Sequence, residues 1–344
     1  MLIKYLRNHI INNRTKVLLN NKKDILSKSL FNNLDFKFYN FGKKNKNKIF
    51  YIIRRSPGGG MFSNLNFIIH HLYIAKKMNF IPFVDMENFF TIYNCQIKIN
   101  NSKNAWSYCF KQVSKFKIAD IYKSQNVIIC DNKTKNIKYF DGFNNLNNEH
   151  LKIFRKHIKF NKKIQKFTNE YLLKNFFNRK VLGIHFRGSD QKTQERHPLP
   201  ATKDQMINAA KFLLSKYKFD KIFVSTEEKD YLDFFKKEFP EKILFINYRR
   251  SSKEDLFENK NKKSRYNIGL GNIIDMLLLS KVNYLLFVES NLPEASLFYS
   301  KNKIPFTKIF NGFNSKNIFV AQFLWYIKSK LPFFIGGFKK NIFK

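Results

Sequence analysis

The chain has 344 residues, which is enough for two domains that each bury a core of their own. Its formal net charge of +39 comes from lysines and arginines spread over the whole length rather than gathered in one stripe, so we expect no nucleic-acid partner. No stretch approaches the roughly 18 apolar residues of a membrane span, and residues 1–20 contain no signal-peptide core. These properties favour a cytoplasmic protein, with attachment to the inner face of a membrane as an alternative that a basic surface allows.

The cysteines exclude two common classes of small domain. Cys95, Cys109 and Cys130 are an odd number, lie in the N-terminal half and show no CxxC spacing. A disulfide framework or a zinc site is therefore not indicated, and we expect buried free thiols.

The N-terminal half contains the pattern of a strand, a glycine loop, a helix and a second strand. Residues 48–54 (KIFYIIR) are apolar and β-branched, and they lead into a Ser-Pro-Gly-Gly-Gly loop where no helix could continue. Residues 63–78 carry apolar side chains at helical spacing, and residues 80–85 (FIPFVD) form another apolar run. A further strand is predicted at 127–130. His70 and His71 lie on the predicted helix, where packing or surface roles are expected.

The C-terminal half alternates regularly between strands and helices, after a basic amphipathic stretch at 149–178. Thr202 and Gln205 form a capping box at the start of one helix. This alternation predicts an α/β fold whose parallel sheet binds ligands beyond the carboxyl ends of its strands. The strands are expected at 181–186, 221–225, 243–247 and 284–288, and the helices from 202 and at 228–238, 270–281 and 293–300. We predict three parts: an acceptor-side α/β domain at 1–175, a nucleotide-sugar-binding domain at 176–318, and a C-terminal helix and tail at 319–344.

One predicted strand carries two side chains suited to binding an anion. Because side chains alternate along a strand, His185 and Arg187 project from one face while Ile184 and Phe186 project from the other. A guanidinium can grip phosphate oxygens with two parallel hydrogen bonds. The alternative is that His185 is a satisfied histidine near the core and that Arg187 pairs with Asp190.

The loop that contains Gly58, Gly59 and Gly60 has two readings. It lacks the Lys-Ser/Thr of a Walker motif and the spacing of a dinucleotide-binding motif. The glycines allow a tight turn between strand and helix, and they also allow Ser63 and Asn64, at a helix N-terminus, to face a ligand.

Several strings in the chain resemble the fucosyltransferase superfamily, which includes α1,6-fucosyltransferases, Nod-factor fucosyltransferases and O-fucosyltransferases. The string GIHFRGSD is similar to the donor-site motif of these GDP-fucose-dependent enzymes. Further strings match in the same order, over about residues 48–300; they are 58–77 (GGGMFSNLNFIIHHLYIAKK), 223–228 (FVSTEE), 264–266 (SRY), 274–280 (IDMLLLS) and 287–291 (FVESN). The resemblance implies a fold of GT-B type, with two Rossmann-like domains facing a cleft.

The resemblance also implies roles for individual residues. His185 and Asp275 would recognise the guanine base or its ribose, and Arg187 with Ser290 would hold the β-phosphate. Glu195 stands where the family has a glutamate proposed as catalytic base. The remaining implied site residues are the paired acids Glu227 and Glu228, and the donor-loop residues Asp190 and Asn291. The chain differs from the family motif at two positions, and these differences bear on which sugar the donor carries. The family's second arginine is Gly188 here, and its loop lysine is Gln191, with Lys192 adjacent.

The expected reaction is transfer of fucose or a related sugar from a GDP-sugar to a glycan acceptor. The chain contains no Asp-x-Asp sequence, so we expect no metal and no cofactor besides the donor, and the resemblance implies inversion of the anomeric centre. The alternative is a non-catalytic nucleotide- or polyanion-binding protein on the same fold. For the C-terminal segment, residues 319–328 are expected to pack on the N-terminal domain, whereas 331–344 suit either packing or attachment to a membrane surface.

Overall fold

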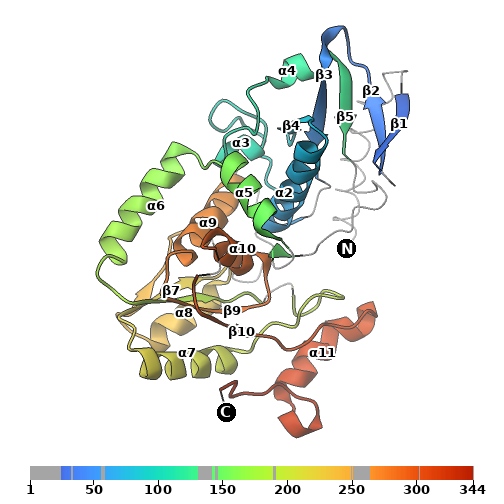
Figure 1. Cartoon of the computed structure of the whole chain (residues 1–344). Helices are drawn as coiled ribbons and strands as arrows, with labels where there is room; N and C mark the ends of the chain where they lie inside the picture. The colour runs from blue at the N-terminus through green and yellow to red at the C-terminus, as the bar shows by residue number, and fades with distance from the viewer. Residues whose placement is uncertain are drawn as a thin grey trace. The chain divides into compact units, whose positions relative to one another are not determined.

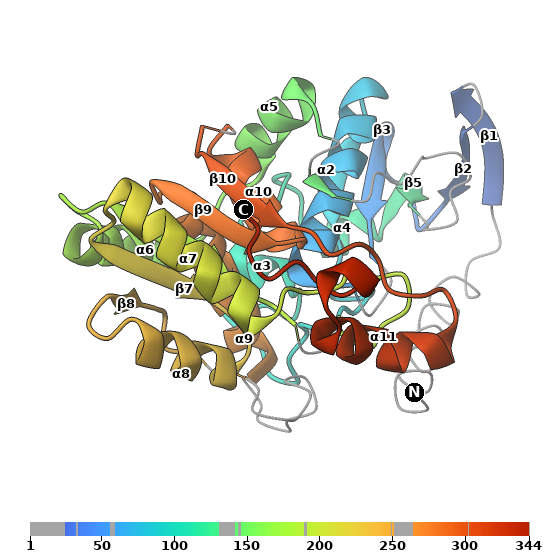
Figure 2. The same ribbon diagram turned by 90° about the horizontal axis from the view of Figure 1, so that it is seen from below.

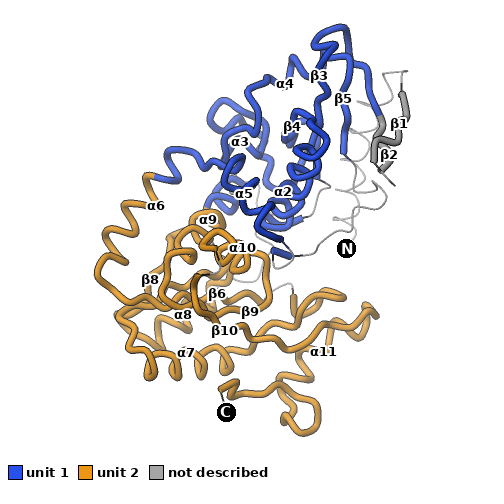
Figure 3. Tube along the Cα trace, in the orientation of Figure 1, with its two compact units in different colours: residues 1–165, 260–270 blue, residues 166–259, 271–344 orange. Residues whose placement is uncertain are grey.

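The computed structural model describes residues 25–31, 34–55, 59–130, 142–143, 146–188, 191–248, 250, 264–301 and 303–343. The chain divides into two compact units, one formed by Met1–Gln165 with Lys260–Leu270 and the other by Lys166–Asn259 with Gly271–Lys344 (Figure 3). Two of the three division points fall inside helices, α6 (Lys162–Asn175) and α9 (Ser264–Leu279), and the third lies outside the described residues. The sequence placed the boundary at the end of α6 and did not foresee the return of 260–270 to the first unit.

The first unit is built on a mixed sheet of five strands in the order β1-β2-β5-β3-β4. The predicted strands are confirmed as β3 (Lys44–Ile53), β4 (Ile81–Val84) and β5 (Ser124–Ile129), which are parallel to one another. The strands β1 (Ile25–Phe31) and β2 (Leu34–Tyr39) add an antiparallel edge that the sequence did not predict.

The helix of this unit's βαβ element is α2 (Met61–Lys77), which connects β3 to β4 as predicted. Its packing role is visible at His71, which is 2% exposed and whose Nδ1 lies 2.7 Å from the Tyr51 hydroxyl. Burial lowers the pKa of His71 to about 3, so this histidine stays neutral inside the unit. All three cysteines are free thiols; Cys109 and Cys130 are buried as expected, whereas Cys95 is half-buried. The unit's other described helices are α3 (Trp106–Cys109), α4 (Ile118–Ile121) and α5 (Asn148–His157).

The second unit contains five parallel strands in the order β10-β9-β6-β7-β8 (Figure 1). The strands are β6 (Val181–His185), β7 (Lys221–Ser225), β8 (Ile243–Leu244), β9 (Tyr284–Val288) and β10 (Phe306–Ile309). Chain order runs outward from β6 in one direction through β7 and β8, and then restarts on its other side with β9. The point between β6 and β9 is therefore a topological switch point, beyond whose carboxyl ends such sheets bind ligands.

The helices of the second unit agree with the predicted alternation. They are α7 (Lys203–Tyr217), α8 (Lys229–Glu238), α9 and α10 (Asn291–Tyr299), followed by α11 (Ile318–Lys330) and a short 3-10 helix, η2 (Phe333–Ile335). The capping box is present, with Thr202 Oγ1 accepting from the Gln205 amide while Gln205 Oε1 accepts from the Thr202 amide. In Figure 2 the helices α7 and α8 lie along the sheet formed by β7, β9 and β10.

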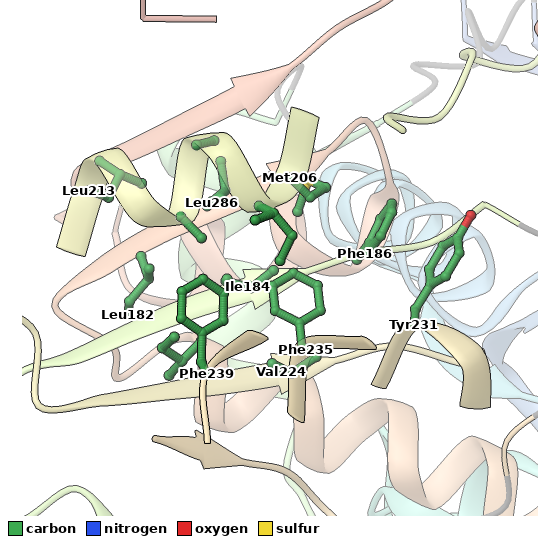
Figure 4. Close-up of a cluster of buried hydrophobic side chains, with 14 of the residues drawn as sticks. Leu182, Ile184, Phe186, Met206, Leu213, Val224, Tyr231, Phe235, Phe239 and Leu286 are labelled. Carbon is green, nitrogen blue, oxygen red and sulfur yellow. The ribbon is translucent and has the colours of Figure 1, made fainter. Parts of the chain in front are cut away.

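One face of this sheet and the helices α7 and α8 share a continuous apolar core (Figure 4). Ile184 and Phe186 both point into it, as their alternation predicted. The opposite face of β6 is covered by α9, so closely that a Cβ on Gly183 would lie 2.9 Å from side-chain atoms of Leu279 and Val282. His185 therefore leaves β6 on the side that α9 covers.

Candidate functional site

His185 ends β6 and is one of several buried polar residues at this edge of the sheet. Its side chain is 3% exposed, and its Nδ1 lies 3.1 Å from the Ser225 hydroxyl at the end of β7. Burial, reinforced by the charge of Arg187, lowers the pKa of His185 to about 3, so the imidazole is neutral near pH 7. With the residues that the structure describes, the buried Nε2 forms no hydrogen bond. A buried polar atom of this kind suggests a contact supplied by a ligand.

Asp275 on α9 is a second buried polar residue of the same region, and its partners are Tyr248 and Ser225. The residue is fully buried, and its Oδ2 accepts a hydrogen bond of 2.6 Å from the Tyr248 hydroxyl. Burial raises the pKa of Asp275 to about 7, and hydrogen bonds from Tyr248 and Ser225 oppose that rise. Gly271 makes room for Tyr248, since a Cβ there would lie 2.8 Å from the tyrosine ring.

The raised pKa of Asp275 predicts a pH-dependent contribution to stability. Between an ordinary carboxyl pKa of 3.8 and the native value of about 7, the folded protein holds a proton that the unfolded chain has released. The contribution of Asp275 to the free energy of unfolding is therefore largest below pH 3.8. It is lost as the pH rises through the native pKa of about 7. Urea unfolding of wild type and Asp275→Asn should show the wild type losing stability relative to the variant across this range. The exposed Asp233→Asn serves as the control, and a difference that stays constant with pH would contradict the prediction.

Arg187 and Ser290 follow the ends of β6 and β9, which are neighbouring strands. Arg187 is half-buried, and its charge acts on His185. Ser290 is the N-cap residue of α10, but its side chain makes no capping hydrogen bond, and Asn291 is the first residue of that helix. The arginine, the serine hydroxyl and the helix N-terminus thus belong to the same edge of the sheet, which suits a phosphate group.

Gly188, where the resembling family has a second arginine, has little room for a side chain. A Cβ at this position would lie 2.6 Å from the Tyr231 hydroxyl. Tyr231 is 4% exposed and stacks on Phe186, with ring centroids 3.9 Å apart. The neighbouring Lys192 lies over the same tyrosine and, at 4.7 Å from the ring centroid, over Trp325. The space beside Arg187 is therefore filled by packed aromatic side chains.

Glu195 lies in a loop that is tied to the segment after β10. The amide of Arg196 donates to Ser315 O at 3.1 Å, and the amide of Leu199 donates to Gly312 O at 2.8 Å. Arg196 has a left-handed backbone, with φ of 61°, which turns the chain directly after the glutamate. The Glu195 carboxylate is half-buried and has neither a hydrogen bond nor an ion pair within the described part of the chain. The structure thus brings Glu195 into the same unit as Arg187, without a direct contact between them.

The paired acids follow β7. Glu227 accepts a hydrogen bond of 3.3 Å from the Asn272 amide on α9, and Glu228 is the N-cap residue of α8. The negative charge of Glu228 raises the pKa of the nearby Tyr231, although burial is the larger cause. Glu227 therefore has a side-chain hydrogen-bond partner, whereas the Glu195 carboxylate has none among the residues that the structure describes.

Two residues of this region were missed in the sequence. Tyr248 and Arg250 follow β8 in a stretch for which the sequence predicted no site residue, and Arg250 is bound to the backbone. Its guanidinium donates to Thr226 O and Ile246 O, both at 2.9 Å, and lies over the Tyr248 ring. No local pattern marks these contacts, because they depend on the chain returning to the end of β7.

The glycine loop belongs to the first unit. Gly60 is the N-cap residue of α2, and Asn64, which is 2% exposed, donates to Gly59 O at 3.1 Å. Ser63 accepts a hydrogen bond of 3.0 Å from the Arg55 guanidinium. Gly58 and, in the donor loop, Asp190 lie outside the described residues.

Comparisons with known proteins identify the fold. No family model matches the chain, and no curated protein matches it in sequence. Among solved structures, the NodZ alpha-1,6-fucosyltransferase co-crystallised with GDP is 13% identical, with 72% of this chain and 91% of that chain covered and a TM-score of 0.46. POFUT1 in complex with GDP-fucose is 10% identical, with 78% and 99% covered and a TM-score of 0.43.

The selenomethionine structure of the fucosyltransferase NodZ from Bradyrhizobium gives a higher score. It is 14% identical, covers 76% of this chain and 94% of that chain, and has a TM-score of 0.50. The predicted α/β class is confirmed by the two sheets, in which parallel strands predominate. The chain therefore has a fold similar to that of the GT-B fucosyltransferase NodZ, as its sequence motifs indicated.

Proposed function

We propose that the chain is a glycosyltransferase that transfers fucose, or a related sugar, from a GDP-sugar to a glycan acceptor. The observation that carries this proposal is the pairing of a buried neutral imidazole, His185, with Arg187 at the switch point between β6 and β9. The fold is similar to that of NodZ, which is a fucosyltransferase, and the motifs of the donor site occur in the family's order.

The diphosphate of the donor would be held at the ends of β6 and β9. The Arg187 guanidinium, the Ser290 hydroxyl and the amide groups that begin α10 would stabilise the negative charge that grows on the leaving GDP. These groups directly follow buried strands, so we expect little reorganisation as the bond breaks.

The nucleoside would be recognised by the groups packed against α9. The open Nε2 of His185 offers either a donor or an acceptor, depending on its tautomer. Asp275 offers a carboxyl group whose pKa of about 7 allows it to accept or to donate a hydrogen bond near neutral pH. A ligand that reaches Asp275 would have to displace the Tyr248 hydroxyl or bind beside it.

The transfer itself requires one base and one leaving group. The acceptor hydroxyl loses its proton to a carboxylate as its oxygen bonds to the anomeric carbon, and the bond from that carbon to the β-phosphate oxygen breaks with inversion. Glu195 is the proposed base, because its carboxylate has no partner in the described structure, whereas Glu227 is bound by Asn272. Glu227 and Glu228 are the rival candidates.

A non-catalytic nucleotide- or polyanion-binding protein is the second candidate. It is favoured by Gly188, whose surroundings are filled by Tyr231 where the resembling family has a second arginine. Such a protein would bind GDP but release no sugar.

One experiment distinguishes the two candidate functions, glycosyl transfer and binding without turnover. It also tests the proposal that no metal takes part in the reaction. The full chain is screened for thermal stabilisation by a panel of nucleotide sugars, because a ligand that binds only the native state raises the melting temperature. Release of GDP from the stabilising sugar is then measured with and without EDTA. We expect GDP-fucose to stabilise the protein and its turnover to stay within about twofold in EDTA, because no proposed step uses a metal.

The outcomes separate the candidates. Stabilisation by GDP without any turnover in the presence of glycan acceptors supports the binding protein. Turnover that disappears in EDTA and returns with Mn²⁺ or Mg²⁺ contradicts the metal-independent reaction. Stabilisation by another nucleotide sugar instead of GDP-fucose assigns a different donor.

A further inference from the structure

The C-terminal helix α11 is fixed to the second unit by specific contacts on its inner side. The Trp325 indole donates to Pro200 O at 2.8 Å, and Gln322 donates to Thr193 O at 3.3 Å. Ala321 is fully buried. The sequence led us to expect residues 319–328 to pack on the N-terminal domain, but α11 belongs to the second unit and binds the loop after β6.

The chain that follows α11 is also held in place. The Phe338 amide donates to Lys328 O at 3.1 Å, and Gln205 on α7 donates to Lys339 O at 2.9 Å. Phe343 stacks on Phe212, with ring centroids 4.3 Å apart. The helix and the tail are therefore held against this unit, and the side chains on their outer side can be identified.

The outer side of α11 is apolar. Phe319, Val320, Phe323, Tyr326 and Ile327 recur at the spacing of one helix face, and all are exposed, Phe319 by 78%. In η2, Phe333, Phe334 and Ile335 are also exposed, with Phe334 at 86%. We call these eight side chains the α11–η2 surface. Large apolar side chains grouped in this way mark an interaction site rather than ordinary protein surface.

Along the sequence, the charge of the segment that carries the α11–η2 surface has one sign. Residues 295–344 contain nine lysines and no aspartate or glutamate. Lys316, Lys330, Lys339 and Lys340 are exposed and flank the apolar side chains in sequence. The partner that this combination fits is apolar inside and anionic at its edge. A second copy of the chain fits poorly, because two such surfaces would bring lysines against lysines.

We propose that the α11–η2 surface binds the interface of an anionic lipid bilayer. No helix in the part of the chain that the structure describes is long and apolar enough to cross a membrane, so the helix would lie in the plane of the interface. Its phenylalanine rings would enter the boundary between headgroups and acyl chains, while the lysines would meet anionic headgroups. This proposal rests on the surface alone and does not require the proposed glycosyl transfer.

The test uses the full chain and vesicles of phosphatidylcholine with or without phosphatidylglycerol, at about 0.15 M salt, where charges more than about 8 Å apart are largely screened. Flotation measures the bound fraction of wild type and of Phe319→Gln/Phe323→Gln/Phe334→Gln. We expect this variant to bind anionic vesicles at least about tenfold more weakly, because it loses the side chains that would enter the lipid. The matched control is Leu173→Gln/Phe177→Gln, whose side chains are 68% and 66% exposed elsewhere on the same unit.

A second pair of variants tests whether the lysines beside the α11–η2 surface contribute more to vesicle binding than lysines elsewhere on the chain. Lys316→Gln/Lys330→Gln/Lys339→Gln should weaken binding to anionic vesicles more than Lys218→Gln/Lys237→Gln/Lys281→Gln, although both remove the same charge. Equal losses would mean that the overall charge, and not this surface, attracts the lipid.

Three further results would overturn the proposal. The phenylalanine variant could bind vesicles as well as wild type. Light scattering could show a wild-type dimer that the variant converts to a monomer, in which case a second copy covers the surface. The variant could unfold at a markedly lower temperature than wild type, which would mean that the rings are covered within the folded chain.

Discussion

Arg187→Ala is expected to weaken GDP binding by on the order of a hundredfold, because the diphosphate would lose its charge-assisted hydrogen bonds. The guanidinium is half-buried at the end of β6, beside a histidine that is neutral and cannot replace its charge. Gly188 contributes no cation, and Lys192 already lies over two aromatic rings. Within the part of the chain that the structure describes, neither position 188 nor Lys192 is therefore placed to replace the lost charge.

Calorimetry with GDP measures this effect, with two variants for comparison. Arg187→Lys keeps the charge but not the planar fork, so its affinity should lie between those of wild type and alanine. Arg179→Ala removes an exposed arginine just before β6 and should leave the affinity unchanged. Undiminished GDP binding by Arg187→Ala would remove this residue from the donor site.

Glu195→Gln is expected to lower turnover by on the order of a hundredfold or more while GDP affinity stays within a few-fold of wild type. The loop of Glu195 is fixed by backbone hydrogen bonds to Gly312 and Ser315, which the substitution does not touch. The variant should therefore keep the loop and lose only the capacity to accept the acceptor's proton.

The rival bases are tested in the same assay. Glu227→Gln and Glu228→Gln are measured in parallel with Glu195→Gln, and the exposed Glu241→Gln serves as the control. Full turnover in Glu195→Gln, together with a loss in either of the paired acids, would assign the base to the end of β7. A loss of GDP affinity in Glu195→Gln would indicate a role in donor binding instead.

Local patterns in the sequence predicted most of the second unit. Strands such as 221–225 are buried apolar runs, and helix α7 carries its own capping box, so each element is specified within a few residues. The strand β10 was missed because its sequence, FTKI, is short and mostly exposed. The antiparallel strands β1 and β2 were also missed, although the first five residues of β2 (LDFKF) alternate between apolar and polar side chains.

The contacts that shape the candidate site depend on residues distant in sequence. His185 was predicted to lie at a strand end, but its partner Ser225 is supplied by the next strand. Tyr248 reaches Asp275 across 27 positions, and Arg250 binds the backbone at Thr226. A run of basic residues in a loop looks solvated in the sequence, and only the fold determines which of them turns inward.

The close approach of Gly188 and Tyr231 makes the order of any future substitutions important. Adding an arginine at 188 while the tyrosine remains would force a packed ring, stacked on Phe186, out of its position. Shortening Tyr231 first would open that space, at the cost of a cavity beside the core. The two positions are thus epistatic: a two-arginine donor site is accessible from this sequence by one mutational path and obstructed along the other.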